Sequence, residues 1–362
     1  MTYSSVYIYP YGANAPEESI NPYIQDMMEG MQNHCLVLNY GKKNRDGVLD
    51  MIKNINRIDA IILNWIESLP DRKWGRAQTL LLFFIICWLK WKNRKIIWVL
   101  HNKRPHARTN KKFKTLLFGF IMRHATTIIT HSSEGVDYLK RFGKGYEEKA
   151  HFIPHPVKRI NNPKSKHEPM RLNGQDIYDI IIWGTVNPYK GIDRFLENLN
   201  DSGVINKYKI LIAGKFTSGD YYRKVRNMCG VRTQIKNKYI PYDELKTLIR
   251  QSKIILFPYK PETILSSGAL ADSITYDSVI IGPNVGAFHD LARAGVIECF
   301  NDHKELIGLI DKHMKRDKDS ISWDNRLDYI RENTWQQFTA RLCELVHQEA
   351  HKNARPSAQK GY

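Results

Sequence analysis

Residues 254–270 read IILFPYKPETILSSGAL, and this stretch decides the fold class. The apolar run from Ile254 to Tyr259 predicts a buried strand, and the small residues from Ser266 to Gly268 precede a predicted helix. Glu262 lies between the two. Open parallel α/β sheets bind ligands beyond the carboxyl ends of their strands, and free N–H groups at a helix start favour anions. The stretch predicts either a serine-capped connection or a site for an anion such as a diphosphate.

The same alternation of short apolar runs and helical patterns extends over the whole chain. Runs that are apolar almost without interruption are typical of parallel strands buried on both faces. In the first half, the predicted strands are 6–9, 35–38, 60–64, 96–101 and 126–130, with a short run at 151–154. In the second half, they are 177–183, 207–213, 234–240, 253–258, 278–281 and 296–300.

The chain has 362 residues, more than one hydrophobic core usually supports, so two domains are expected. Residues 161–176 lack apolar periodicity and are rich in Asn, Pro and Lys, which indicates a linker. We therefore expect one Rossmann-like domain at 1–160 and a second at 177–334. Residues 335–351 have helical apolar spacing, and 352–362 form a basic tail.

The composition favours acidic partners. There are 55 Lys and Arg residues against 37 Asp and Glu, a net charge of +18. Such a balance suits nucleotide phosphates, anionic lipids or nucleic acid, but nucleic acid is disfavoured because no zinc-finger spacing or RNP-like motif occurs. The five cysteines are odd in number and lack CxxC spacing, which indicates reduced cysteines and no structural zinc site. The first residues lack a signal-peptide pattern, so a cytoplasmic protein is expected.

The apolar decamer from Leu80 to Leu89 has two interpretations. It is too short to span a bilayer, and Lys90, Trp91 and Lys92 follow it. It is either a helix buried against a sheet or an interfacial helix with tryptophans at headgroup depth and cations beyond them. The second interpretation predicts peripheral contact with the inner face of the cell membrane.

Polar residues end several predicted strands of both halves. His101 ends the predicted strand 96–101 and Asn102 follows it, and Gly12 and Asn14 lie in the loop after the first strand. The carboxyl edge of the sheet is where substrate contacts gather, so these residues are candidates for the acceptor side of a site. His101 could donate or accept a hydrogen bond with a sugar hydroxyl, or stabilise a developing charge.

Glycine and lysine meet at two strand ends of the second half. Gly184 and Thr185 follow 177–183, with Lys190 a few residues on, and Lys215 follows 207–213. Glycine lets a ligand approach the backbone closely, and a lysine ammonium suits phosphate. Neither a G-x-G-x-x-G nor a P-loop motif is present, which disfavours a dinucleotide dehydrogenase and a P-loop NTPase.

The order of these motifs resembles the GT-B glycosyltransferases, especially the large retaining family 4 and its bacterial capsular and exopolysaccharide enzymes. The resemblance covers essentially the whole chain. It is carried by Gly184, Lys190-Gly191, Leu211 to Gly214, Tyr239 to Pro241, Asp243 to Leu245, Ile254 to Pro258, Glu262, Gly286 and Gly295, and in the first half by His101, Ser132 and Ile153-Pro154. Trp335 resembles the aromatic residue that opens the family's C-terminal helix.

The resemblance implies an α/β protein of GT-B architecture. Two Rossmann-like domains with parallel sheets would face each other across a cleft, and a C-terminal helix would return to the first domain. It also implies transfer of a sugar from a nucleotide diphosphate sugar, of UDP or GDP type, to a saccharide acceptor that is lipid-linked. Configuration at the anomeric carbon would be retained. Lysines and a helix start would stabilise the leaving group, so neither a metal nor another cofactor is expected.

The roles that the resemblance implies divide the site in two. Lys190 would contact the diphosphate, with Gly184, Thr185 and Lys215 near it. Glu262 and the amides of Ser266, Ser267 and Gly268 would hold the donor sugar and phosphate, and His101 would reach toward the reacting sugar from the first domain.

The chain departs from the family pattern at two positions. Thr185 stands where the family has an arginine, so neutralisation of phosphate would rely on Lys190 and Lys215. The family's second glutamate falls at Leu270, and Asp272 is nearby but out of register. Two alternatives stay open on sequence alone: a nucleotide-sugar epimerase of the same architecture, and a non-catalytic basic protein that binds membranes or nucleic acid.

Overall fold

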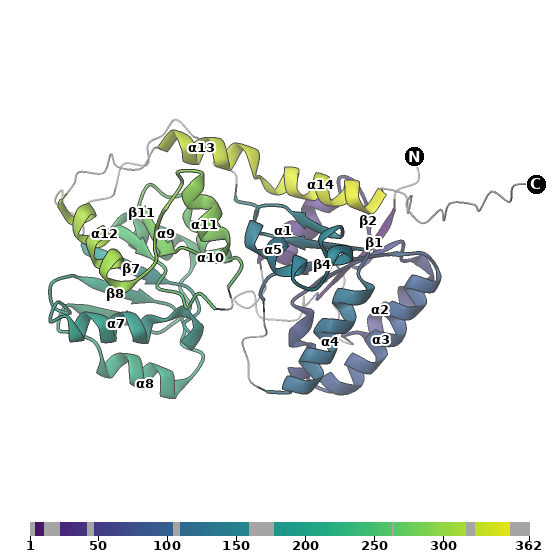
Figure 1. Ribbon diagram of the computed structural model, residues 1–362, viewed down its shortest axis with the longest axis horizontal. Helices are drawn as coiled ribbons and strands as arrows, with labels where there is room; N and C mark the ends of the chain where they lie inside the picture. The colour runs from purple at the N-terminus through teal and green to yellow at the C-terminus, as the bar shows by residue number, and fades with distance from the viewer. Residues whose placement is uncertain are drawn as a thin grey trace, which may run out of the picture.

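The computed structural model describes residues 4–10, 22–41, 47–103, 109–158, 177–262, 264–315 and 323–347. These residues form two six-stranded parallel sheets, one from each half of the chain. Figure 1 shows the two halves side by side, with α13 and α14 running along one side of both. The prediction of two Rossmann-like α/β domains with parallel sheets is confirmed.

The first sheet has the order β2-β1-β3-β4-β5-β6. Its strands are β1 (Ser5–Tyr9), β2 (Leu36–Val37), β3 (Ala60–Asn64), β4 (Lys95–Leu100), β5 (Thr127–Thr130) and β6 (Ala150–Phe152). The connecting helices are α1 (Pro22–Met31), α2 (Leu49–Asn54), η2 (Ile55–Arg57), η3 (Ile66–Asp71), α3 (Gly75–Trp91), α4 (Lys111–His124), α5 (Ser133–Lys140) and α6 (Lys144–Glu147).

The second sheet has the order β12-β11-β10-β7-β8-β9. Its strands are β7 (Tyr178–Trp183), β8 (Ile210–Ala213), β9 (Thr233–Lys236), β10 (Ser252–Leu256), β11 (Val279–Pro283) and β12 (Glu298–Phe300). Its helices are η4 (Pro188–Lys190), α7 (Ile192–Asp201), α8 (Gly219–Asn227), α9 (Tyr242–Arg250), α10 (Gly268–Ser273), α11 (Gly286–Arg293), α12 (His303–Lys315) and α13 (Trp323–Glu332).

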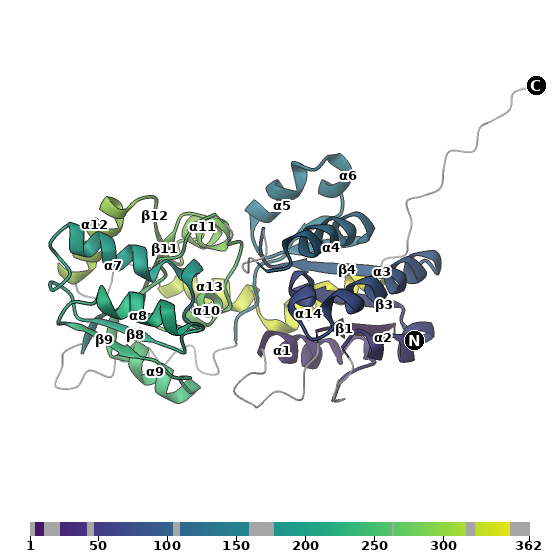
Figure 2. The same cartoon turned by 90° about the horizontal axis from the view of Figure 1, so that it is seen from below.

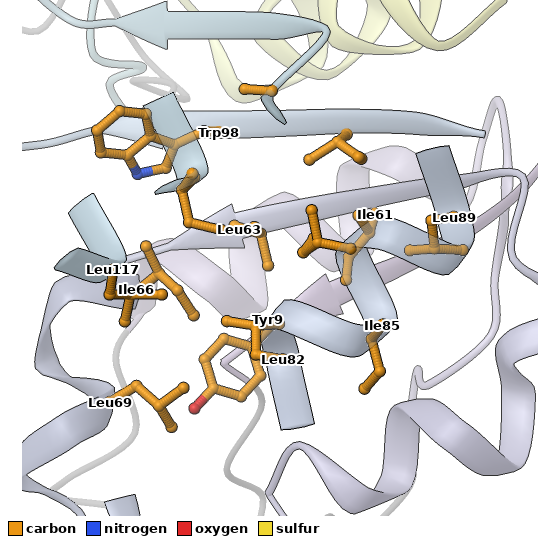
Figure 3. Packing of buried hydrophobic residues seen from close by; sticks show 14 of the residues in the cluster. Tyr9, Ile61, Leu63, Ile66, Leu69, Leu82, Ile85, Leu89, Trp98 and Leu117 are labelled. Carbon is orange, nitrogen blue, oxygen red and sulfur yellow. The ribbon is translucent and has the colours of Figure 1, made fainter. Parts of the chain in front are cut away.

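Both faces of the first sheet are buried, as its apolar strands predict. On one face Tyr9, Leu63 and Trp98 pack against α3 and α4, as Figure 3 shows. On the other face Val6 and Ile62 pack against α1 and against α14 (Trp335–His347). Burial on two faces explains why these strands are apolar without alternation.

The C-terminal helix belongs to the first domain in space. Phe338, Leu342 and Val346 of α14 join the cluster that contains Met27 and Met31 of α1. The preceding helix α13 is anchored to the second domain, because the buried Arg326 donates to the carbonyls of Val296 at 3.0 Å and Tyr276 at 2.7 Å. The two helices therefore tie both domains together, and the expected return of the C-terminal helix is confirmed.

One strand ends earlier than predicted. β9 stops at Lys236, whereas the apolar pattern predicted a strand as far as residue 240. The next residue, Asn237, turns its side chain to β8 and accepts a hydrogen bond from the N–H of Phe216 at 2.9 Å. The chain leaves the sheet there because the N–H beyond β8 is hydrogen-bonded by this side chain and not by the backbone of a longer β9.

Gly214, directly after β8, is expected to tolerate no side chain. Its φ is +150°, and a Cβ would lie 2.1 Å from the carbonyl oxygen of Gly184. We expect Gly214→Ala to lower the unfolding free energy by about 2–4 kcal/mol, because backbone has to move. The control is Gly203→Ala, whose φ is +68° with open space around it; about 1–2 kcal/mol is expected there. Urea unfolding of both variants measures the difference, and equal losses would contradict the steric argument.

Candidate functional site

The second sheet changes direction at β7. β8 and β9 lie on one side of this strand and β10 to β12 on the other. At such a topological switch point the connections from two adjacent strands, here β7 and β10, run in opposite directions and leave a crevice at their carboxyl ends. Ligands of open α/β sheets bind in that crevice. Gly184 and Thr185 follow β7, and the segment from Pro258 to Glu262 follows β10. The residues singled out in the sequence therefore flank the switch point.

Lys190 is buried at this point, with only 4% of the residue exposed. Its Nζ donates a hydrogen bond to the carbonyl oxygen of Trp183 at 3.0 Å and lies 5.4 Å from the centre of the Tyr259 ring. A Cβ on Gly184 would lie 2.7 Å from the same Nζ, so the missing side chain of Gly184 provides the space for the ammonium group. Lys190 forms no ion pair with any described residue.

Burial lowers the pKa of Lys190 from 10.5 to about 7. The cause is desolvation, because the ammonium group has left water without gaining a carboxylate partner among the described residues. An anion placed next to Nζ would favour the charged form and offset that cost. A buried lysine without a carboxylate partner among the described residues is a candidate for binding a negatively charged ligand.

The loop before α10 approaches Lys190 through Tyr259. The Tyr259 hydroxyl lies 3.3 Å from Oγ of Ser267, and that Oγ also accepts a hydrogen bond from the N–H of Leu270 at 3.4 Å. Ser267 is therefore both the N-cap of α10 and a neighbour of the tyrosine above Lys190. The structure brings Gly184, Lys190, Tyr259 and Ser267 together, with Ser266 half-buried and Gly268 exposed beside them.

Three other candidate residues have exposed side chains. Thr185, Lys215 and Glu262 form no side-chain hydrogen bond or ion pair with any described residue. The backbone of Lys215 nevertheless lies next to the loop after β7, because the carbonyl oxygen of Lys215 accepts a hydrogen bond from the N–H of Val186 at 2.8 Å. The two lysines therefore differ in kind: Lys190 is buried beside Gly184, and Lys215 is a solvated cation at the next strand end.

Asp272 lies in a different electrostatic environment. Burial raises its pKa to about 6, the positive charge of Lys158 acts in the opposite sense, and Asp26 of α1 raises it further. Lys190 does not contribute to this shift. Asp272 thus faces charges of the interdomain segment and of the first domain, whereas Ala269 of the same helix is the residue next to Gly184.

His101 ends β4 inside an aromatic cluster. Its ring stacks on Trp65 at 4.0 Å with an interplanar angle of 11°, and its Nε2 lies 3.2 Å from Oδ1 of Asn64. Burial, together with His131 and His155, holds its pKa well below the usual 6.5. The imidazole is therefore neutral at neutral pH, which favours the hydrogen-bonding role over the stabilisation of charge. The other acceptor candidates Gly12 and Asn14 lie outside the described residues.

The cluster around His101 contains residues that the sequence did not single out for a site. The Tyr23 hydroxyl lies 2.8 Å from Nε2 of His131, whose Nδ1 lies 2.8 Å from the carbonyl oxygen of Ile153. Burial lowers the pKa of His131 to about 3 and that of His155 to about 4. Tyr23 lies in the first turn of α1, and His131 follows β5 as His101 follows β4. The same strand-end rule, applied to β5, would have found it.

The two domains touch at the end of β4. Asn102 and Ile264 form an isolated antiparallel bridge, and Leu265 is completely buried in the cluster on the α3 side of the first sheet. The residue after His101 is thus paired with the loop that carries Glu262. Through this bridge the first domain lies directly beside the connection from β10 to α10.

A second contact joins α5 to α11. Asp290 accepts hydrogen bonds from the N–H of Ser133, at 2.8 Å, and from its hydroxyl. Glu134 accepts one from the N–H of Gly286 at 2.7 Å and forms an ion pair with Lys103. We call these residues, Lys103, Ser133, Glu134, Gly286 and Asp290, the interdomain latch. Sequence reasoning missed them as a group, because their partners are about 150 residues apart in the chain.

The described residues contain no group of three or more His, Cys, Asp or Glu side chains that could hold a metal ion. At the switch point Lys190 is the buried cation, Asp193 pairs with Lys224 and Lys260, and Glu262 is an exposed carboxylate of the connection from β10 to α10. The arrangement as a whole suits an anionic ligand bound by a buried lysine, with polar and aromatic groups of the first domain close to the same connection.

The architecture matches several solved structures over nearly their full length. HepE of Anabaena in complex with UDP-glucose has a TM-score of 0.68 and 11% identity, covering 95% of this chain and 100% of that one. The trehalose-6-phosphate synthase OtsA has a TM-score of 0.63 at 11% identity, covering 95% and 99%. AviGT4, a glycosyltransferase involved in avilamycin A biosynthesis, has 0.57 at 11%, covering 95% and 97%.

The chain has the GT-B fold. The expected fold class is therefore confirmed. The sequence itself matches no protein-family model and no curated protein. At such low identity the structural likeness concerns the fold, and the chemistry has to be argued from the residues at the switch point.

Proposed function

We propose that this chain is a glycosyltransferase that uses a nucleotide diphosphate sugar, of UDP or GDP type, as its donor. The observation that carries the proposal is Lys190: a buried lysine without a carboxylate partner, beside Gly184 at the topological switch point. A diphosphate next to its Nζ would supply the missing counter-charge. The UDP-glucose complex of HepE, a protein with the same fold, supports a nucleotide sugar as the ligand.

In the proposed reaction the bond between the anomeric carbon and the β-phosphate oxygen breaks, and a new bond forms to an acceptor hydroxyl oxygen. The nucleoside diphosphate leaves with the bonding electron pair, and the acceptor proton moves to it. Lys190 stabilises the negative charge that develops on the departing diphosphate, with Lys215 adding a weaker, solvent-screened contribution. The proposed reaction uses neither a nucleophilic side chain of the protein nor a metal ion.

We assign the remaining roles as the resemblance to family 4 implies. Glu262 binds hydroxyls of the donor sugar, and Ser266, Ser267 and Gly268 line the diphosphate with Thr185. The neutral His101 hydrogen-bonds to the reacting sugar from the first domain, with Asn102 on the acceptor side. We further propose a saccharide acceptor that is lipid-linked, retention of anomeric configuration, and a place in surface polysaccharide assembly. Leu270 replaces the family's second glutamate, so another group of the site binds the ribose.

The test is incubation of the full chain with UDP- and GDP-sugars and a panel of saccharide acceptors. We expect UDP or GDP to raise the melting temperature, since a ligand that binds only the folded state stabilises it. Release of nucleoside diphosphate should require an acceptor, and NMR of the product reports its configuration. Conversion of the donor without an acceptor would indicate an epimerase instead. No response to any nucleotide or nucleotide sugar would contradict the proposal.

Glu262→Gln is expected to lower kcat/KM about 10²-fold while the melting temperature without ligand stays unchanged, because this side chain is exposed and has no partner among the described residues. The matched control is Glu332→Gln, an exposed glutamate at the end of α13. It should leave turnover unchanged. Equal activity of both variants would remove Glu262 from the site.

A further inference from the structure

Helix α3 has two apolar faces, and only one of them is covered. Leu82, Ile85, Ile86 and Leu89 are completely buried against the first sheet. On the opposite face Leu80, Phe84 and Trp91 are 60%, 63% and 68% exposed, and Cys87 is exposed between them. Their spacing follows the helical repeat, so they form one continuous stripe along the helix. The covered face confirms a helix packed against a sheet, and the interfacial interpretation stays a prediction for the exposed face.

The neighbouring helix α4 widens this stripe into a surface. Phe83 and Phe120 meet at 4.3 Å along the seam between the helices, and Leu116 on α4 is 56% exposed. Trp74, directly before α3, is 76% exposed. Figure 2 shows α3 and α4 side by side, on the face of the first sheet opposite the one that α14 covers. We call the exposed residues of 74–92 and 111–123 the α3–α4 surface.

The exposed charged residues of this surface are all positive. No Asp or Glu occurs between Asp71 and Glu134. Among the described residues of this stretch the exposed cations are Arg72, Lys73, Arg76, Lys90, Lys92, Lys111, Lys112 and Arg123, whereas Arg94, Lys103 and Lys114 form ion pairs with Asp59, Glu134 and Asp71. Near the C-terminal end of α3 two positive charges lie close to each other. Burial lowers the pKa of Lys149, and the positive charge of Lys90 lowers it further. A partner that fits this surface is therefore both apolar and anionic.

We propose that the α3–α4 surface docks the protein on an anionic lipid bilayer. Aromatic and aliphatic side chains would enter the boundary between headgroups and acyl chains, and the surrounding cations would contact lipid phosphates. The end of α3 already has the required arrangement: Lys92 Nζ lies 4.2 Å from the ring centre of Trp91 and 5.3 Å from that of Trp88. Among the described residues no helix is long and apolar enough to cross a membrane. The exposed stripe runs along the length of α3, so the proposed docking places this helix flat on the bilayer.

A second copy of the chain fits the surface poorly. A symmetric pair would place the same cations against each other without any carboxylate to neutralise them, which costs free energy. The segment after α14 is not a complement either, because it contributes Lys352, Arg355 and Lys360. An anionic bilayer satisfies both the apolar stripe and the charge.

The orientation of the surface also connects it to the site. α3 and α4 both begin at the carboxyl edge of the first sheet, where Asn110 donates to the carbonyl of Pro70 at 3.0 Å and accepts a hydrogen bond from Arg76 at 3.2 Å. His101 and Asn102 end β4 at that same edge. Docking would therefore bring the acceptor side close to the lipid headgroups. This last step rests on the proposed function, whereas membrane docking itself does not.

The test is co-sedimentation of the full chain with vesicles of phosphatidylcholine alone and of phosphatidylcholine with phosphatidylglycerol, without any nucleotide sugar. We expect binding to the anionic vesicles only, weakened by salt. Phe84→Ser combined with Trp91→Ser should weaken it about tenfold or more, through the lost apolar contact. Lys92→Glu combined with Lys112→Glu should weaken it by about tenfold through charge. All four side chains are exposed or solvent-facing on the helices, so the melting temperature should not change.

Matched controls lie on the second domain. Val231→Ser with Tyr239→Ser removes apolar side chains that are 92% and 50% exposed, and Lys209→Glu with Lys304→Glu reverses exposed charges. Both controls should bind vesicles like the unaltered protein. Equal loss in the controls, or equal binding to uncharged vesicles, would overturn the proposal. A dimer that the serine variant dissociates, with no vesicle binding, would assign the surface to a second copy. Turnover on a soluble acceptor, measured separately, distinguishes this outcome from failure of the proposed function.

Discussion

Lys190→Met is expected to abolish most sugar transfer, lowering kcat/KM about 10²- to 10³-fold. The loss follows from the position of Nζ, which is buried beside Gly184 and is the cation nearest to the proposed diphosphate. A buried donor that faces the developing charge contributes more than an exposed one, because water does not screen it. Steady-state release of nucleoside diphosphate, with acceptor at saturation, measures the effect.

The same substitution should stabilise the folded protein. A buried ammonium without a carboxylate partner costs free energy, and Met fills a similar volume without that cost. We expect the unfolding free energy to rise by about 1–4 kcal/mol, as judged from urea unfolding. The control is Lys260→Met: Lys260 is the neighbour that pairs with Asp193 at 3.6 Å, and its loss should leave turnover nearly unchanged. Lower stability together with lower activity in Lys190→Met would instead indicate a structural role.

Because the pKa of Lys190 is lowered, the unfolding free energy and the nucleotide affinity should both depend on pH. The pKa is about 7 in the free protein and 10.5 for an ordinary lysine, so between these values the unfolded state binds more protons. The unfolding free energy should therefore rise with pH across that window, and this rise should be absent in Lys190→Met. A bound diphosphate raises the pKa again, so nucleotide affinity should fall above pH 7. Calorimetry at about pH 8, in buffers of different ionisation enthalpy, should detect uptake of up to about one proton per nucleotide.

The sheets could be predicted from the sequence because burial on both faces leaves a direct pattern. Val6 to Tyr9 and Ile254 to Leu256 are apolar without alternation, and each forms a central strand of a parallel sheet. The predicted end of β9 was wrong. The side chain of Asn237 accepts the hydrogen bond of the Phe216 N–H, which a longer β9 would otherwise have to accept, and a single side-chain contact of this kind leaves no periodic pattern in the sequence. The boundaries predicted at 160 and 176 lie outside the described residues and stay predictions.

The grouping of several candidate residues at one edge of the second sheet was predictable, because it depends only on their positions relative to strand ends and helix starts. Gly184, Lys190 and Ser267 were found because each lies just past a strand or just before a helix. The burial of Lys190 was not predictable, since it depends on Tyr259 and on the absent side chain of Gly184. The interdomain latch was missed for a different reason. Its hydrogen bonds join α5 to α11, and neither helix carries a pattern that identifies the other as its partner.

The interdomain latch leads to the second large expected effect. Glu134→Ala combined with Asp290→Ala should lower kcat/KM about 10- to 100-fold without touching the proposed donor site. Asp290 holds both polar groups of Ser133, and Glu134 holds the N–H of Gly286 while pairing with Lys103. Removing both carboxylates leaves the donors of the buried Gly286 and the half-buried Ser133 unpaired, at about 1–3 kcal/mol for the group most affected. The domains should then spend less time in the arrangement that joins Asn102 to Ile264.

Two measurements separate this explanation from simple destabilisation. Small-angle X-ray scattering should give a larger radius of gyration for the double variant, and nucleotide affinity should change less than kcat, since Lys190 stays in place. Asp311→Ala is the matched control, because Asp311 accepts from Lys207 and Tyr208 within the second domain alone. It should lower stability without changing the radius of gyration. An unchanged radius in the latch variant, or an equal change in the control, would show that α5 and α11 do not hold the domains together. In that case the bridge between Asn102 and Ile264, together with α13 and α14, would be sufficient to fix their arrangement.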